Sequence, residues 1–288
     1  ALDLGPVNWA WVLHGVAEVA IATGDPHRAV AVCDEALEQM AEACTAVRVL
    51  HHATKAQAFA ELGDHAAARE QATIVLDATA DGSASSDRIR ALITLAVIAR
   101  REEATDDAET RAHEALPLAR PMGHHRGVVD ALEVLACCAA DDERNEEAAR
   151  LIGAADTIRR ATTYAYRAPS FATEFASLTA ELEAAMGAEF ARALAEGQAL
   201  SLEEACDYAT RGRGERKRPA TGWAALTTTE IKVATLVAKG LTNVQVGQQL
   251  FISRHTVDSH LRHIYAKLGI STRAELATRV VRRDGADA

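Results

Sequence analysis

The sequence predicts an all-α protein: a solenoid of helical hairpins followed by a small helical domain. Of its 288 residues 49% are apolar and 25% are charged, proportions that allow a folded core, and only 4% are aromatic. Alanine is the commonest residue. Because sheets usually contain more β-branched and aromatic side chains, this composition favours closely packed helices. The length suggests about two domains.

An alanine-led pattern repeats through the first 160 residues. Ala29, Ala68, Ala108 and Ala148 lead its four copies at intervals of 39, 40 and 40 residues, and Gly-Asp precedes the alanine in the first two. Each copy follows an apolar helix, so each unit is predicted to be a helix, a tight turn and a second helix. Stacked units of this kind bury a shared core that a single hairpin cannot form.

The Gly-Asp turn and the alanine of the second helix resemble the tetratricopeptide repeat (TPR). Most large aromatic residues of that repeat are missing, so a more general helical-hairpin solenoid fits equally well. The segments 131–155 and 196–205 are similar to the helical region of large ATPase-type regulators, the MalT-like or LAL group, which end in a LuxR-type DNA-binding domain. We assign residues 1–210 to a TPR-like repeat domain. It is either a scaffold or a surface for a protein or small-molecule effector.

Charge divides the chain into an acidic body and a basic end. Residues 211–288 contain 14 basic and 6 acidic residues (net +8), which leaves 17 basic and 35 acidic residues (net −18) in 1–210. A basic end on an acidic body is typical of a nucleic-acid-binding protein, although acidic solvated helices also contribute to the difference. Residues 211–222 lack apolar periodicity, which predicts a basic linker before a domain at 223–288.

Two capping boxes predict short helices at the start of this last domain. Thr227 and Glu230 fit a capping box that opens a helix to about residue 239, and Thr242 and Gln245 fit a second that opens a helix to about Leu250. Two short capped helices with a glycine between them are half of a helix-turn-helix.

The third helix is predicted at 254–268, with Ser253 as its cap. Val257, Leu261, Ile264 and Leu268 follow helical spacing and are expected to face the other helices. The opposite face is polar, so this helix has the character of one that reads base edges in the major groove. Ser271 is then expected to cap a last helix, in which Leu276, Ala277 and Val280 form an apolar strip.

These elements carry a strong resemblance to the LuxR-type DNA-binding domain. Five blocks match it in order and spacing: Leu226–Glu230, Ala238–Asn243, Leu250–Ser253, Thr256–His260 and Lys267–Ile270. The resemblance implies a four-helix domain that binds double-stranded DNA, with the third helix in the major groove and a homodimer through the last helix (272–283). It places Asp258, Ser259 and Arg262 at base-reading positions, and Ser253, Arg254, His255, Thr256, Val257 and Lys267 at backbone-contacting positions.

The sequence leaves the role of Asp258 open and predicts the exposure of three other side chains of the third helix. Asp258 could accept a hydrogen bond from a cytosine amino group, or could orient Arg262 and repel phosphate, and the sequence favours neither. Arg262 and Lys267 are both expected to face solvent, so that replacing either by alanine should leave the fold intact. His260 lies near the core side and is expected to pack rather than to catalyse.

Several other classes of site are not expected. No G-x-x-x-x-G-K-[ST] motif occurs, so the chain is predicted to be no enzyme and to bind no cofactor, although an ATPase domain could precede it in a longer parent. Five cysteines without C-x-x-C spacing indicate buried reduced thiols. The pairs His51-His52 and His124-His125 are expected at the surface rather than on a metal. No signal peptide or membrane span is predicted, which favours a cytoplasmic bacterial regulator. The alternative is a protein-binding adaptor whose terminal domain has lost DNA affinity.

Overall fold

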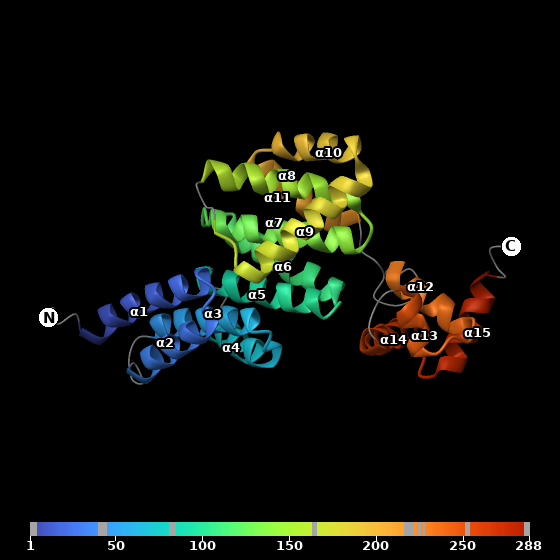
Figure 1. Cartoon of the computed structure of the whole chain (residues 1–288), viewed down its shortest axis with the longest axis horizontal. Coiled ribbons are helices and arrows are strands. Elements are labelled where there is room, and N and C mark those ends of the chain that lie inside the picture. The colour runs from blue at the N-terminus through green and yellow to red at the C-terminus, as the bar shows by residue number, and fades with distance from the viewer. Residues whose placement is uncertain are drawn as a thin grey trace. The chain divides into compact units, whose positions relative to one another are not determined.

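The computed structural model describes residues 5–39, 45–80, 85–162, 166–215, 222–223, 226, 228–250 and 254–284. The side chains of residues 5–7, 211–215, 228–229, 255–256, 259, 281 and 284 lie outside this description. The chain divides into two compact units, Ala1–Arg211 and Gly212–Ala288. All regular secondary structure in the described part is helical, as predicted (Figure 1).

The first unit is a series of helical hairpins. Its helices are α1 (Gly5–Ala22), α2 (Pro26–Gln39), α3 (Thr45–Glu61), α4 (His65–Ala78), α5 (Ser86–Arg101), α6 (Thr105–Ala119), α7 (His125–Asp141), α8 (Asn145–Ala161), α9 (Pro169–Met186), α10 (Ala188–Gln198) and α11 (Leu202–Glu215). α1, α3, α5 and α7 pack against one another in that order, while α2, α4 and α6 each lie between two of them. The four odd-numbered helices therefore form one face, called here the inner face (Figure 1).

The hairpin turns are alike in their hydrogen bonds. In the first, the amide of Gly24 donates to Ile21 O (3.0 Å) and that of Asp25 donates to Ala20 O (2.8 Å), and the other three hairpins repeat both bonds. The turn requires a residue at positive φ, which is Gly24 (80°) and Gly63 (75°) in the first two hairpins but Glu103 (61°) and Glu143 (62°) in the next two. The Gly-Asp signal thus marks only half of the turns, because the later two hold a strained glutamate instead.

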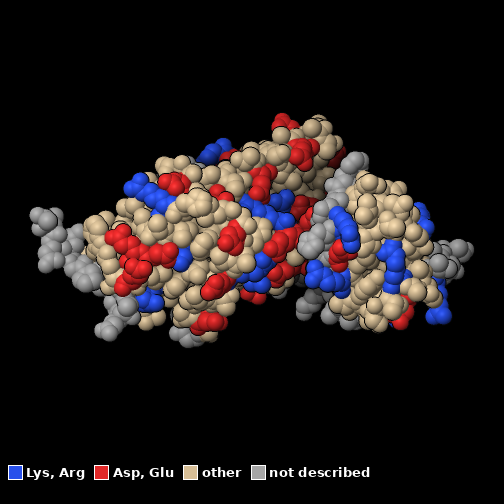
Figure 2. All heavy atoms as spheres, turned by 60° about the horizontal axis from the view of Figure 1, so that its bottom comes forward, with Lys and Arg blue, Asp and Glu red and all other residues tan. Residues whose placement is uncertain are grey.

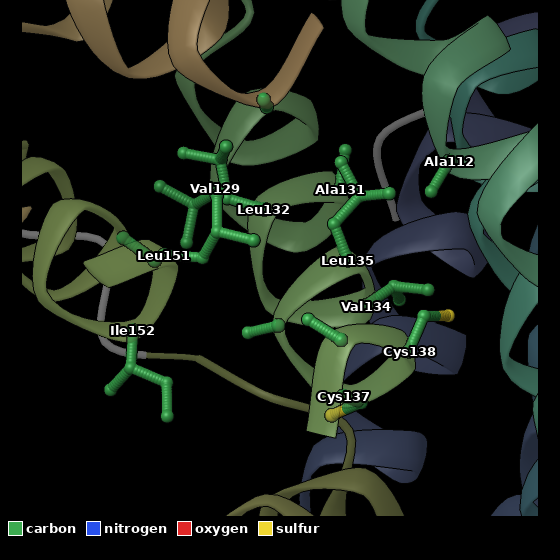
Figure 3. Packing of buried hydrophobic residues seen from close by; sticks show 14 of the residues in the cluster. Ala112, Val129, Ala131, Leu132, Val134, Leu135, Cys137, Cys138, Leu151 and Ile152 are labelled. Atoms are coloured by element: carbon green, nitrogen blue, oxygen red, sulfur yellow. The ribbon is translucent and has the colours of Figure 1, made fainter. Parts of the chain in front are cut away.

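The alanine-led repeat packs as predicted. Ala29, Ala68, Ala108 and Ala148 are all fully buried, where a small side chain lets neighbouring helices approach closely. The largest core cluster is centred on α7, which buries Val129, Leu132 and Leu135 against Leu151 of α8 (Figure 3). Cys33, Cys137, Cys138 and Cys206 are buried free thiols, as predicted, and burial raises the pKa of Cys137 to about 12. Cys44 lies outside the described residues.

A pair of glycines joins α8 to α10. A Cβ placed on Gly153 would lie 2.2 Å from Leu194 O, and one on Gly197 would lie 1.9 Å from Arg150 O. No larger residue fits at either position without moving a backbone. Gly153 lies in segment 131–155 and Gly197 in segment 196–205, so these two segments meet at the crossing of α8 and α10.

Two expectations about the first unit were wrong. His51 is buried, with its Nε2 3.1 Å from Ala10 O, because α3 is packed between α1 and α5. α11 continues to Glu215, so helix replaces the first five residues of the predicted linker.

The described residues of the second unit from Thr228 onward form four short helices, as the resemblance implied. They are α12 (Thr228–Ala238), α13 (Asn243–Leu250), α14 (Arg254–Leu268) and α15 (Arg273–Asp284). α12 packs against each of the other three, and α13 packs against α14. Across the described part of the chain, no helix combines the length and the apolar character needed to cross a membrane.

Candidate DNA-binding surface

α14 has one buried and one exposed face. Its bounds coincide with the predicted 254–268, and Val257, Leu261, Ile264 and Leu268 are all buried in the core of the second unit, as the spacing predicted. His260 is also buried, in agreement with a packing role. On the other side Arg262 and His263 are exposed, and the Arg262 guanidinium has no partner among the described residues. An exposed arginine without an internal partner can form a bidentate contact with guanine.

A polar network fixes the N-terminal end of α14. Asn243 Nδ2 donates to Asp258 Oδ1, and Arg273 Nη1 donates to Asn243 Oδ1 (2.8 Å). Arg254 lies at ion-pair distance from Asp258 (3.8 Å). Asp258 is therefore bound to Asn243 and Arg254 rather than to Arg262. The network joins the starts of α13, α14 and α15, and neither Asn243 nor Arg273 was identified from the sequence as part of the site.

Lys267 fixes the other end of α14. Its Nζ donates to both oxygens of Glu230, at 3.2 and 2.9 Å, and the two side chains are only 21% and 3% exposed. The expectation that Lys267 faces solvent was wrong, which bears on the expectation that Lys267→Ala leaves the fold intact. The reason is that α12 places a buried carboxylate beside it, 37 residues away in sequence.

The helix caps follow the sequence with one displacement. Thr242 and Gln245 form the predicted capping box, since the Thr242 amide donates to Gln245 Oε1 (2.8 Å) and the Gln245 amide to Thr242 Oγ1 (3.4 Å). The cap of α15 is Thr272 rather than Ser271, because the Glu275 amide donates to Thr272 Oγ1 (3.2 Å). The predicted caps Thr227 and Ser253 lie outside the described residues.

The remaining candidate contact residues are placed as follows. Arg254 is exposed at the first position of α14, with 73% of its side chain accessible. The Val257 side chain is buried, so only its main chain could reach a phosphate. His255, Thr256 and Ser259 belong to α14, but their side chains lie outside the described set.

α15 uses its apolar strip inside the domain. Leu276 and Val280 are buried in the core, and α15 packs against α12. Its exposed residues include Thr278, Arg279 and Arg282. The strip therefore does not form an apolar surface for a second copy.

Charge on the second unit is mainly basic. On the face shown in Figure 2 its coloured side chains are mostly Lys and Arg, whereas the first unit shows many acidic side chains among its basic ones. In the described part of the chain, no group of three or more His, Cys, Asp or Glu side chains is arranged to hold a metal ion.

The four-helix arrangement and the exposed face of α14 define a helix-turn-helix DNA-binding domain. Residues 224–280 match the family model "Bacterial regulatory proteins, luxR family", so the C-terminal unit contains a LuxR-family helix-turn-helix domain.

Similarity to mycobacterial proteins extends over nearly the whole chain. Proteins of Mycobacterium tuberculosis (strain ATCC 25618 / H37Rv) and Mycobacterium bovis, each named as an inferred HTH-type transcriptional regulator, are 38% identical over 283 residues, which cover 98% of this chain and 32% of each relative. The transcriptional regulatory protein LiaR of Bacillus subtilis is 40% identical over 52 residues, 18% of this chain and 25% of that protein. The chain thus spans about a third of the length of the mycobacterial relatives. No solved structure matches it significantly.

Proposed function

We propose that this chain is a sequence-specific transcription regulator that inserts α14 into the major groove of double-stranded DNA. The observation that carries the proposal is the exposed polar face of α14 opposite a fully buried stripe, within a LuxR-family domain. The network around Asp258 and the Lys267–Glu230 pair hold this helix in place before DNA arrives. Such an arrangement avoids paying the cost of ordering on binding.

Two sets of residues divide the work at the DNA. Asp258, Ser259 and Arg262 are proposed to read bases. Ser253, Arg254, His255, Thr256, Lys267 and the main chain of Val257 are proposed to contact the sugar-phosphate backbone, which positions the helix without reading sequence.

Arg262→Ala on the full chain tests the base-reading role. We expect a loss of about 1 to 3 kcal/mol on the preferred site and a relaxed preference at one base pair. Lys239→Ala is the matched control, because it removes the same charge from an exposed position just after the C-terminal end of α12 and belongs to neither contact set. Competition on randomised duplexes measures both variants, and unchanged base preferences in Arg262→Ala would remove it from the base-reading set.

Arg254→Ala tests the backbone set. It should weaken binding to all sequences alike and reduce the salt dependence by about one phosphate contact. If the full chain binds no duplex even at low salt, the proposal fails and the adaptor alternative takes its place.

The first unit is proposed to supply the regulatory input. Its inner face offers an effector or partner a surface built from several hairpins, as in other helical-repeat proteins. We further propose that the regulator acts in the cytoplasm and belongs to the large ATPase-type group, with any phosphate-binding loop outside this chain. The resemblance of 131–155 and 196–205, and the greater length of the mycobacterial relatives, support this.

A homodimer through residues 272–283 is also proposed. Because Leu276 and Val280 are buried, the contact would have to be made by polar side chains such as Arg279 and Arg282. Analytical ultracentrifugation of the full chain with and without duplex tests it.

A further inference from the structure

A small, partly open cavity lies at the inner face of the first unit. It has a volume of about 80 Å³ and lies among α3, α5, α7 and the segment from Tyr166 to Phe171. At roughly 15 Å³ for each water-sized probe, it has room for about five waters, or a ligand of about five to eight non-hydrogen atoms. Ile93, Val97, Val134 and Phe171 give it an apolar lining.

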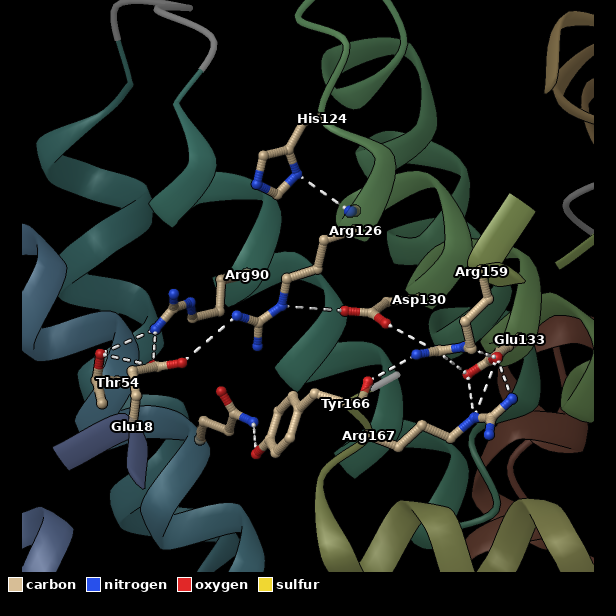
Figure 4. Close-up of polar contacts among 12 residues, drawn as sticks. Glu18, Thr54, Arg90, His124, Arg126, Asp130, Glu133, Arg159, Tyr166 and Arg167 are labelled. Atoms are coloured by element: carbon tan, nitrogen blue, oxygen red, sulfur yellow. Dashed lines mark hydrogen bonds and ion pairs between the residues drawn. The ribbon is translucent and has the colours of Figure 1, made fainter. Parts of the chain in front are cut away.

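Polar side chains at the edge of the cavity are mostly occupied by one another. The Arg101 guanidinium donates hydrogen bonds to Glu174, Ser170 and the Ala60 carbonyl. Arg167 donates its Nε and Nη2 to Glu133, at 2.7 to 3.1 Å, as Figure 4 shows. These arginines have no free edge for a ligand.

Arg90 differs from them. Its Nη1 donates to Glu18 Oε1 and to Thr54 Oγ1 (2.9 Å), while its Nε and Nη2 face no acceptor among the described residues (Figure 4). The Nε–Nη2 edge of a guanidinium presents two parallel N–H groups, which match the two oxygens of a carboxylate.

A second polar group in the cavity also lacks a partner. Gln57 contacts Tyr166 Oη at 3.4 Å through one end of its amide, while the other end is buried without a partner in the described structure. Gln57 lies one helical turn beyond Thr54 on α3, and both Gln57 and Arg90 line the cavity. A buried amide of this kind costs free energy unless water or a ligand satisfies it.

We propose that this cavity binds a small carboxylate as an effector. Its carboxylate binds side-on to the Nε–Nη2 edge of Arg90, and a hydroxyl or amino group donates to the unpartnered Oε1 of Gln57. A short apolar body fills the space beside Val97 and Phe171. Phosphate fits less well, because it brings more charge beside Glu61 and Asp130 and has no apolar part.

The proposal rests on the regulatory role proposed for the first unit, but binding is measured without DNA. The full chain is titrated by calorimetry with straight and branched carboxylates of about three to six carbons, a size set by the cavity. The amide of each acid and inorganic phosphate are titrated in parallel. We expect at least one carboxylate to bind at one site per chain, with its amide at least about tenfold weaker.

Two variants and a control locate the site. Arg90→Lys keeps a cation beside Glu18 but removes the side-on pair of N–H groups, and Val97→Phe fills the cavity; both should abolish binding. Arg69→Lys, on the surface of α4 where Arg69 pairs with Glu102, should bind as the wild type does. Thermal unfolding shows whether each variant is folded.

The outcomes separate the two proposals. Binding of no carboxylate, equal binding of acid and amide, preferential binding of phosphate, or unchanged binding by folded Arg90→Lys and Val97→Phe each overturns the carboxylate site. A chain that binds a carboxylate but no duplex keeps the site and loses the proposed function. A chain that binds duplex but no carboxylate keeps the proposed function and loses the carboxylate site.

Discussion

The close crossing of α8 and α10 requires that residue 197 have no side chain beyond hydrogen. A Cβ there would lie 1.9 Å from the Arg150 carbonyl oxygen and 2.7 Å from its carbon. Because carbon and carbonyl oxygen rarely approach closer than about 3.3 Å, the two helices would have to separate by about 1.4 Å. Overpacking of this kind costs about 1 to 3 kcal/mol or more, and alanine returns about 1 kcal/mol of helix propensity. Gly197→Ala should therefore lower the free energy of unfolding by about 2 kcal/mol.

Urea unfolding of the full chain, followed by circular dichroism, measures this change. Gly15→Ala is the matched control, because Gly15 lies within α1 and a Cβ there would meet no heavy atom within 4 Å. It should raise stability by up to about 1 kcal/mol through helix propensity alone. If Gly197→Ala unfolds at the same urea concentration as the wild type or a higher one, the close approach of α8 and α10 is refuted.

The structure predicts whether each of three further changes raises or lowers the stability of the protein. Lys267→Ala should lower stability by about 2 kcal/mol in chemical denaturation, because Glu230 loses its cation while remaining buried; an unchanged midpoint would show that the pair contributes nothing. Burial raises the pKa of Asp130 from 3.8 to about 6, so the folded protein binds this proton more tightly and stability falls as pH rises through that range, by at most about 3 kcal/mol. His14 has the opposite effect on stability, because burial lowers its pKa to about 4. The free energy of unfolding of the wild type is therefore compared with that of Asp130→Asn at each pH. Parallel pH dependences of the two proteins would contradict the raised pKa of Asp130. Glu143→Gly should raise the free energy of unfolding by up to about 1 kcal/mol, and with it the melting temperature, because glycine adopts a positive φ without strain. A lower melting temperature would mean that contacts of the glutamate side chain outweigh the strain.

Local patterns predicted much of the fold. The bounds of α14, its buried stripe and the leading alanines of the hairpins all follow from spacing and residue size within a few turns of helix. The capping box at Thr242 is equally local.

What the sequence could not predict depends on contacts between distant segments. Lys267 pairs with a carboxylate 37 positions away, and His51 is buried because α3 has packed helices on both sides. The cavity takes its lining from three hairpins and a connecting segment, so no short motif marks it. Gly153 and Gly197 lie in segments that the sequence singled out. That they allow α8 and α10 to pack closely can be recognised only from the positions of the two helices in the structure.

The geometry of α14 connects these distant contacts to the proposed function. Its N-terminal end is tied to α13 and α15 through Asp258 and Asn243, and its C-terminal end to α12 through Lys267. Arg262, between them, has no partner in the described part of the unit. Both anchors use charged or amide groups, whose hydrogen bonds are directional and so fix the rotation of the helix about its axis as well as its position. The buried stripe alone would leave that rotation less closely defined, because apolar contacts are not directional. The polar anchors therefore determine which side of α14 faces solvent, and Arg262 lies on that side, the one proposed to bind DNA.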